Sequence, residues 1–402
     1  MRVAYLTADA GVPVFGRKGC SIHVQEVLRA LIGRGTPVHL FSTSCEGEPP
    51  PGLETIPLHA LPRPAKGDLA AREQHSLALN TEWRAGLERA GPFDFFYERY
   101  SLWSFAGMEY ARETGAPGLL EVNAPLIDEQ AEHRGLVDRA GAERVAGRVF
   151  GAATALLAVS EEVAAYLERV PAAQGKVHVV PNGVNPTRFP SHVTPSRPGG
   201  PGTFTVGFVG TLKPWHGLSI LVEAFARLHQ RNPSTRLLLV GDGPERAKLE
   251  ADLSSHGLRE SVDFTGAVAA GEVPGLLASM DVAVAPYPPL APFYFSPLKV
   301  YEYMAAGLPV VASRIGQLES LIRHGVNGWL TTPGDAAELA RALEQLEHEP
   351  ALRQRLGQSA RSDVLRDHTW DAVVARILRL AGWDATQHSE AAKRPAPSGK
   401  AC

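Results

Sequence analysis

The feature that most constrains this sequence is a series of short, almost wholly apolar segments separated by helical stretches, which stops once and then starts again. Strands buried on both faces read as continuous apolar runs, because helices cover the two sides of a parallel sheet. Each series therefore predicts a doubly wound α/β domain. The first series comprises Val3–Ala8, Val38–Ser42, Phe93–Glu98, Leu119–Asn123, Ala155–Ser160 and Val177–Pro181. The second comprises Phe204–Gly210, Leu237–Val240, Val262–Phe264, Val282–Pro286, Val310–Ser313 and Gly328–Leu330.

The break between the two series lies at residues 191–202, which are rich in Pro and Gly and offer almost nothing to bury. We read this stretch as a linker between a domain of residues 1–190 and a domain of residues 203–365. Apolar residues at helical spacing from Trp370 to Leu380 predict a last helix, over about 366–383, that joins the first domain. Residues 384–402 are small and polar, and we expect a disordered tail.

Charge and length exclude several other classes of protein. The 402 residues carry 40 Lys and Arg against 43 Asp and Glu, so nothing in the charge favours nucleic acid as a partner. The apolar run Val3–Ala8 is followed by Asp9 and is too short for a signal peptide or a membrane span. We therefore expect a cytoplasmic protein without a transmembrane segment, with peripheral membrane contact left open and the oligomeric state unknown.

The first candidate site is the sequence GTLKPWHG at residues 210–217, between a predicted strand and an amphipathic helix. A glycine turn at this point directs backbone N–H groups and the helix dipole toward an anion. Lys213 and His216 can add charge and hydrogen-bond donors, which suits a diphosphate. The alternative is an ordinary loop in which Trp215 packs and Lys213 is solvated.

The second candidate site follows at residues 295–311 and reads as a loop, a helix, a glycine stop and a buried strand. We expect the helix to start near Ser296 with Pro297 in its first position, which places Lys299 in the first turn and makes the helix start a second anion site. Glu302 lies among apolar neighbours on this helix. A carboxylate there can accept two hydrogen bonds from a ribose diol.

Taken together, GTLKPWHG and SPLKVYEYMAAGLPVVAS, supported by PNGVNPTRF at residues 181–189 and VGDGPE at residues 240–245, resemble family 4 of the glycosyltransferases. The resemblance covers nearly the whole chain. It implies the GT-B fold, in which two Rossmann-like domains face each other across a cleft. The N-terminal domain then receives the acceptor, and the C-terminal domain binds a nucleotide sugar.

The same resemblance assigns roles to individual residues. Lys213 and His216 are the basic pair that holds the diphosphate, and Glu302 binds the ribose. Other donor contacts are implied in the N-terminal glycine loop, in the glycine turns of the C-terminal domain, near the base and at the second motif. These residues are Gly16, Gly19, Gly210, Thr211, Gly241, Val268, Ser296, Pro297, Leu298 and Lys299.

Two departures from the family pattern concern the donor. Many members have a Glu eight residues before the ribose-binding one, but Tyr294 stands there, so the backbone of residues 295–298 is expected to meet the sugar instead. The commoner basic pair is replaced by Thr211 and His216. Because histidine titrates near neutrality, we expect the hold on phosphate to depend on pH.

The acceptor side is predicted from a different cluster. Asn123 ends a strand and runs into the acidic residues Asp128, Glu129 and Glu132, which would favour an acceptor bearing amino groups. The alternative is that these carboxylates only complement a helix dipole on a solvated face. Likewise, the loop carrying Gly16 and Gly19 is either a cover over the donor phosphate or a surface turn.

We therefore expect a retaining glycosyltransferase that moves a hexose or N-acetylhexosamine from a nucleotide-diphosphate sugar to a hydroxyl of a small acceptor, such as a glycan, a lipid-linked sugar or an aminocyclitol. No pair of aspartates spaced Asp-x-Asp is present to hold a metal diphosphate, so we expect no cofactor and no metal. A nucleotide-sugar epimerase of similar fold and a nucleotide-sugar binding protein remain the alternatives.

Overall fold

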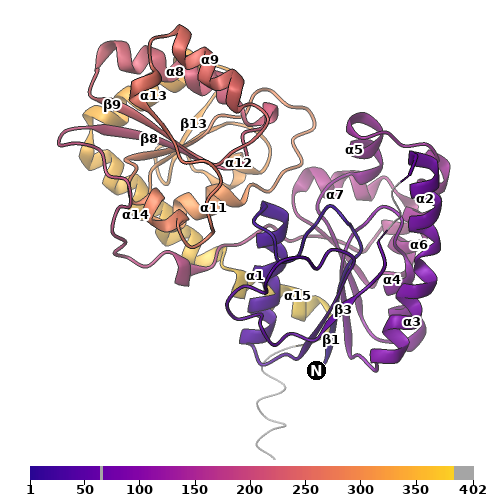
Figure 1. Cartoon of the computed structure of the whole chain (residues 1–402). Helices are drawn as coiled ribbons and strands as arrows, with labels where there is room; N and C mark the ends of the chain where they lie inside the picture. The colour runs from indigo at the N-terminus through magenta and orange to yellow at the C-terminus, as the bar shows by residue number, and fades with distance from the viewer. Residues whose placement is uncertain (64–66, 384–402) are drawn as a thin grey trace, which may run out of the picture.

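The computed structural model describes residues 1–63 and 67–383, which form two parallel sheets with helices on both sides of each (Figure 1). The N-terminal sheet has the strand order β3-β2-β1-β4-β5-β6-β7, and the C-terminal sheet has the order β10-β9-β8-β11-β12-β13. The strand order reverses beside β1 in one sheet and beside β8 in the other. This is the point at which α/β sheets open a crevice at the carboxyl ends of their strands.

The N-terminal domain confirms the first apolar series as strands. Its strands are β1 (Val3–Thr7), β2 (Val38–Ser42), β3 (Leu58–Ala60), β4 (Phe95–Arg99), β5 (Gly118–Val122), β6 (Ala155–Ala158) and β7 (Val177–Val179). Its helices are α1 (Gly19–Gly33), α2 (Leu69–Ala78), α3 (Asn80–Ala90), α4 (Ala106–Thr114), α5 (Leu126–His133), α6 (Arg139–Ala152) and α7 (Glu161–Glu168), with short 3-10 turns at Pro171–Ala173 and Pro186–Arg188.

The C-terminal domain confirms the second series. Its strands are β8 (Phe204–Val209), β9 (Thr235–Val240), β10 (Val262–Phe264), β11 (Val282–Ala285), β12 (Val310–Ser313) and β13 (Trp329–Thr331). Its helices are α8 (Leu218–Arg231), α9 (Arg246–Ser255), α10 (Val273–Leu277), α11 (Leu298–Ala305), α12 (Gln317–Leu321), α13 (Ala336–His348) and α14 (Pro350–Asp367), with 3-10 turns at Pro214–His216 and Arg259–Ser261.

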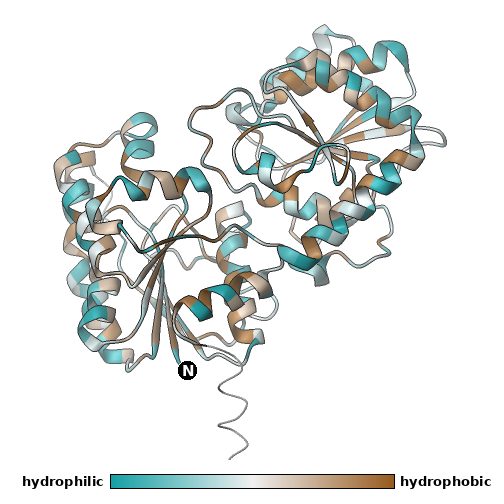
Figure 2. Ribbon diagram, turned by 180° about the vertical axis from the view of Figure 1, so that it is seen from behind, coloured by the Kyte–Doolittle hydropathy of each residue, from teal (hydrophilic) through white to brown (hydrophobic). Residues whose placement is uncertain are grey.

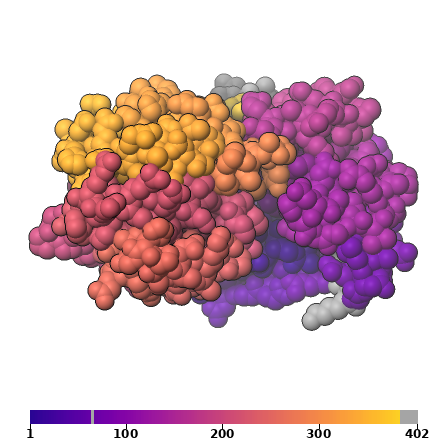
Figure 3. Space-filling view, turned by 90° about the horizontal axis from the view of Figure 1, so that it is seen from above, coloured from indigo at the N-terminus to yellow at the C-terminus, as the bar shows by residue number. Residues whose placement is uncertain are grey.

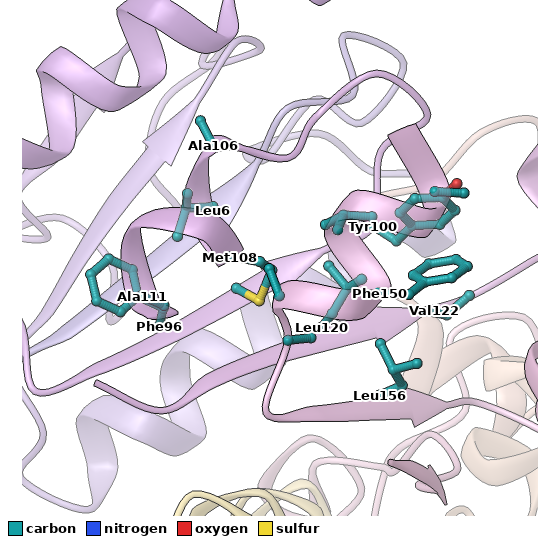
Figure 4. Close-up of a cluster of buried hydrophobic side chains, with 14 of the residues drawn as sticks. Leu6, Phe96, Tyr100, Ala106, Met108, Ala111, Leu120, Val122, Phe150 and Leu156 are labelled. Carbon is teal, nitrogen blue, oxygen red and sulfur yellow. The ribbon is translucent and has the colours of Figure 1, made fainter. Parts of the chain in front are cut away.

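Each sheet separates two hydrophobic clusters, because successive strand residues point to opposite faces. On β1, Leu6 faces one cluster of the N-terminal domain and Tyr5 faces the other. Met108, Leu120 and Phe150 meet in the first of these clusters (Figure 4). Apolar residues are concentrated on the strands, and polar residues lie on the outer helix surfaces (Figure 2). Both domains therefore have cores of their own.

The chain returns to the N-terminal domain at its end. Val184 accepts a hydrogen bond from the N–H of Trp370 and donates one to the carbonyl of His368, where the chain crosses between the domains. The last helix, α15 (Trp370–Leu380), then packs against α1 (Figure 1). The predicted tail, residues 384–402, lies outside the described residues.

The structure corrects two expectations about secondary structure. Strand β3 is absent from the predicted series, because it is three residues long, lies at the edge of the sheet and is largely exposed. Helix α11 begins at Leu298 and not near Ser296, and Pro297 is its extended N-cap residue. The reason is that Asn182 binds both the hydroxyl and the carbonyl of Ser296, which holds Ser296 outside the helix.

None of the helices in the described part of the chain is long and apolar enough to cross a membrane.

Candidate active site between the two domains

A cleft of about 700 Å³ lies between the domains, at the carboxyl ends of the strands of both sheets. The space-filling view shows the hollow between the two lobes, with N-terminal residues at its bottom (Figure 3). The C-terminal domain lines it with the loops after β8, β9 and β11 and with the start of α11. The N-terminal domain contributes residues 17–20 and the ends of β4 and β5.

The loops after β8 and β9 are held against each other through glycine. Gly241 has a φ of +133°, and a Cβ atom there would lie 2.1 Å from the carbonyl oxygen of Gly210. Gly210 in turn donates its N–H to Val240, and Leu212 donates to Asp242. Both glycines line the cleft, so at these two positions the wall presents bare backbone to a ligand.

The start of α11 forms the adjoining part of the wall. All four predicted residues here, Ser296, Pro297, Leu298 and Lys299, line the cleft. Lys299 is half-buried, but its Nζ is buried and has no hydrogen-bond partner among the described residues. Burial lowers the pKa of Lys299 to about 7, because the charged form loses its solvation.

Glu302 lies one turn further along α11 and also lines the cleft. Its Oε1 accepts a hydrogen bond of 2.7 Å from Nη1 of Arg188, and Nη2 of Arg188 donates to the carbonyl of Ala270. Burial raises the pKa of Glu302, and the nearby guanidinium of Arg188 opposes that shift. The carboxylate is therefore held in place by a partner from the 3-10 turn that precedes the linker.

His216 lines the cleft. Its imidazole ring is neutral, whereas a cation was expected. Its Nδ1 lies 2.6 Å from the carbonyl oxygen of Thr211, which can only accept, so Nδ1 carries the proton and Nε2 of the neutral ring is an acceptor. Burial and the charge of Lys299 lower the pKa of His216 to about 3. The expectation that His216 titrates near neutrality is therefore wrong for this structure.

The N-terminal wall contains a buried polar network behind an exposed loop. Glu121 accepts hydrogen bonds from His23 at 2.8 Å, from Arg99 at 2.9 Å and from the hydroxyl of Tyr97. Although burial opposes it, the charges of His23 and Arg99 bring the pKa of Glu121 down to about 2. The network fixes His23 and Arg99, which line the cleft together with Asn123.

The exposed loop carries two cations, Arg17 and Lys18. Both side chains line the cleft, and neither makes an ion pair within the described chain. Gly19 also lines the cleft and has open space where a Cβ would lie, with only a methyl group of Leu298 at 3.9 Å. The wall facing the C-terminal domain is therefore basic and partly exposed.

Comparison with known proteins identifies the family. Residues 17–188 match the model of Glycosyltransferase Family 4, and residues 203–349 match that of Glycosyl transferases group 1. A 2-deoxystreptamine glucosyltransferase of Streptomyces kanamyceticus is 30% identical over 312 residues, which are 70% of this chain and 77% of that protein. The chain belongs to glycosyltransferase family 4. A D-inositol 3-phosphate glycosyltransferase of Stackebrandtia nassauensis is 29% identical over 98% of this chain and 91% of its own.

Solved structures show that this family 4 glycosyltransferase has the GT-B fold, as the resemblance implied. HepE of Anabaena, in a crystal structure with UDP and glucose, matches 95% of this chain and 99% of its own with a TM-score of 0.72 and 22% identity. WaaG, a glycosyltransferase involved in lipopolysaccharide biosynthesis, matches 95% of this chain and all of its own with a TM-score of 0.69 and 18% identity.

Most of the residues predicted for the site come together in one cleft of this glycosyltransferase. The predicted residues that line it are Gly19, Asn123, Gly210, Thr211, His216, Gly241, Val268, Ser296, Pro297, Leu298, Lys299 and Glu302. Their roles toward a ligand stay predictions.

Four predicted residues lie elsewhere. Lys213 is half-buried, with its Nζ 5.3 Å from the ring centre of Trp215. Gly16 forms a tight turn in which a Cβ would lie 2.8 Å from the side chain of Pro13. Asp128 and Glu129 also lie outside the cleft lining.

The acidic run therefore does not face the cleft, which corrects the predicted acceptor site. Asp128 pairs with Arg139 at 2.6 Å, and Glu129 pairs with Arg134 at 3.1 Å. The hydroxyl of Tyr294, which stands in place of the family's sugar-binding Glu, donates to Glu129 at 3.1 Å across the domain boundary. Asp128 and Glu129 therefore have partners outside the cleft.

Arg188 and Arg99 also line the cleft, although neither was predicted from the sequence. Arg188 belongs to the PNGVNPTRF segment, whose place among the family motifs was a usable signal. Arg99 ends β4 beside the switch point, a position that the strand order reveals but the sequence does not. Within the described residues, no group of three or more His, Cys, Asp or Glu side chains gathers in a way that could hold a metal ion.

Proposed function

We propose that the enzyme transfers a hexose or N-acetylhexosamine from a nucleotide-diphosphate sugar to a hydroxyl of a small cyclitol. The observation that carries the donor assignment is the combination, in one wall of the cleft, of the Gly210 turn, the start of α11 and Glu302. The Gly210 turn lets a ligand approach the backbone closely, the start of α11 offers backbone N–H groups and a helix dipole to a diphosphate, and the carboxylate suits a ribose. HepE has been solved in complex with UDP and with UDP-glucose, which makes UDP sugars the first donors to test.

The reaction needs little covalent chemistry from the protein. The oxygen of the acceptor hydroxyl bonds to the anomeric carbon of the sugar, while the bond from that carbon to the β-phosphate oxygen breaks and its electron pair stays on the oxygen. The acceptor's proton passes to the departing diphosphate. We propose that the new bond forms on the face that the phosphate leaves, with retention of configuration, and that fixed donors stabilise the charge that develops.

The nature of the acceptor follows from the charges that remain unpaired. Among the described residues of the cleft, Arg188 pairs with Glu302 and Arg99 pairs with Glu121, which leaves the side chains of Arg17, Lys18 and Lys299 without an anion. The diphosphate of a nucleotide sugar supplies two negative charges for these three cations. We therefore favour a cyclitol that carries a phosphate over one that carries amino groups, in line with the inositol phosphate named for one relative.

A panel of nucleotide sugars and acceptors tests the proposal. Nucleoside diphosphate should be released only when donor and cyclitol phosphate are both present, and the product's anomeric configuration, read by NMR, should equal that of the donor. An isomerised sugar without acceptor would indicate an epimerase instead, and binding without turnover would indicate a binding protein. Activity should persist in excess EDTA. Loss of activity that Mg²⁺ restores would contradict the proposed independence from metal.

A further inference from the structure

Lys299 lines the cleft, and its buried amine has no hydrogen-bond or ion-pair partner among the described residues. Its Nζ makes no hydrogen bond, and burial of the charged form is the cause of its lowered pKa. The nearest side chains are aromatic: Nζ lies 4.2 Å from the ring centre of Phe208 and 5.6 Å from that of Tyr287. Rings of this kind attract a cation but do not replace hydrogen-bond acceptors.

Within residues 1–63 and 67–383, no carboxylate serves as a counter-ion for Lys299. Glu302, on the same helix, is bound by Arg188, and the other titratable groups around the amine are the neutral ring of His216 and the hydroxyl of Tyr287. A buried cation without a counter-ion destabilises the protein, because the cation loses its hydration and no attraction to an opposite charge offsets that loss. The missing anion is therefore expected to come from the ligand.

The amine lies where a diphosphate is expected. A Cβ on Gly210 would be 3.0 Å from Nζ of Lys299, so the amine lies directly over the glycine turn after β8. Thr211, the next residue, carries no charge, and Lys213 lies over Trp215 and does not line the cleft. Lys299 is thus the one lysine of the described C-terminal domain that lines the cleft.

We propose that Lys299 is a catalytic residue whose ammonium binds the β-phosphate at the Gly210 turn and stabilises the diphosphate as it leaves. This inference rests on the proposed function. When the bond from the anomeric carbon to the β-phosphate oxygen breaks, the electron pair left on that oxygen adds negative charge beside Nζ. An interaction that strengthens in this way lowers the barrier more than it strengthens substrate binding.

The test compares Lys299→Met with Lys213→Met, and with Lys248→Met as a control at an exposed lysine whose Nζ lies 3.8 Å from Glu245. Affinities for UDP and UMP are measured by calorimetry, because only UDP has the β-phosphate. Lys299→Met should lower the preference for UDP over UMP at least about tenfold and reduce kcat by about 10²–10³ with a smaller change in donor KM. Lys248→Met should change neither quantity.

Further measurements separate the possible failures. If the wild-type protein binds neither UDP nor any other nucleoside diphosphate, the proposed function itself fails. If it prefers UDP over UMP and Lys299→Met keeps that preference, only the role of Lys299 fails, and the same loss in Lys213→Met would move the role to Lys213. A lower melting temperature of Lys299→Met with unchanged UDP preference would show that the amine only stabilises the ring pair.

Proton uptake provides an independent readout. At pH 8 the amine of Lys299 is largely neutral, and a diphosphate beside it should raise its pKa, so UDP binding should take up protons. Calorimetry in buffers of different ionisation enthalpy measures this uptake. The uptake should be smaller in Lys299→Met than in the wild-type protein, and equal uptake in the two would contradict the proposal.

Discussion

The two walls of the cleft differ in how their charged groups are held. In the C-terminal wall, Lys299 and Glu302 are half-buried on one helix, with the Nζ of Lys299 fully buried, and the loops beside them touch through glycine. In the N-terminal wall, the cations of Arg17 and Lys18 are exposed on a loop, and the buried charge of Arg99 is neutralised by Glu121. The C-terminal wall is preorganised and is the rigid wall of the cleft. The N-terminal wall carries long, exposed side chains that can change conformation and is the adaptable wall.

This difference matches the two kinds of ligand that such an enzyme must bind. A fixed arrangement of donors stabilises a charge that develops at one place, because no reorganisation is needed when the bond breaks. Exposed arginine and lysine side chains give weaker, salt-dependent contacts and tolerate different geometries. We infer that donor recognition is rigid and acceptor recognition is adaptable.

The largest difference in stability should appear when one glycine of each wall is replaced by alanine. Gly241→Ala places a methyl group 2.1 Å from the carbonyl oxygen of Gly210 at a φ of +133°, so the two loops must separate. We expect a loss of about 3–5 kcal/mol in the free energy of unfolding, measured with urea. Gly19→Ala meets only a methyl group at 3.9 Å and should change the stability by less than about 0.5 kcal/mol. Equal losses in the two variants would remove the contrast in rigidity.

The next effect concerns the ribose contact. Glu302→Gln keeps the shape of the side chain but removes its charge, and should weaken UDP binding by about 1–3 kcal/mol, or roughly 5–150-fold by calorimetry. The control is Glu223→Gln, which breaks an exposed pair with Arg227 and should leave affinity unchanged. A Glu302→Gln protein that melts earlier yet binds UDP normally would show that the carboxylate serves only to hold Arg188.

The residues of the C-terminal wall were easier to predict from the sequence than those of the N-terminal wall. The residues of the C-terminal wall lie in two compact motifs, where Gly210, Lys299 and Glu302 could be identified one by one. Asn123 is part of the cleft as predicted, but Asp128, a few residues further on, turns away on α5 and pairs with Arg139. Local sequence does not reveal the direction in which a short helix leaves a strand. Nor does it reveal a partner such as Arg139, whose side chain comes from another helix.

The protonation of His216 was unpredictable for a related reason. Its neutrality depends on the carbonyl of Thr211 and on the amine of Lys299, which is 83 positions away in the chain but contributes to lowering the pKa of His216. The alternation of strands and helices, in contrast, can be read from the sequence, because it depends on apolar residues that the folded domain buries. The fold was therefore predictable in detail, apart from the exposed edge strand β3 and the start of α11.

A smaller effect should appear at the adaptable wall. Replacing Arg17 and Lys18 together by Gln should raise the KM for a cyclitol phosphate about three- to tenfold, since exposed charges contribute on the order of 1 kcal/mol or less each. The KM for the uncharged cyclitol should stay the same, and added salt should reduce the difference. The matched control neutralises Asp128, Glu129 and Glu132 and should alter neither KM. A lower affinity for an aminated acceptor in that control would restore the predicted acidic acceptor site.

The smallest effect is expected for the pH dependence attributed to His216. His216→Asn keeps a donor near the carbonyl of Thr211, and the histidine it replaces has a pKa of about 3, so both proteins are neutral at this position from pH 5 to pH 8. The shape of the kcat/KM profile in this range should therefore not change.

The profile should instead fall as pH rises above about 7, because the protonated amine of Lys299 is the form that attracts the diphosphate and its pKa is about 7. Lys299→Met should remove that limb, since kcat/KM reports the ionisation of the free enzyme. A limb near pH 6.5 that His216→Asn abolishes and Lys299→Met leaves intact would show that the imidazolium, and not the ammonium of α11, is the titrating cation of the rigid wall.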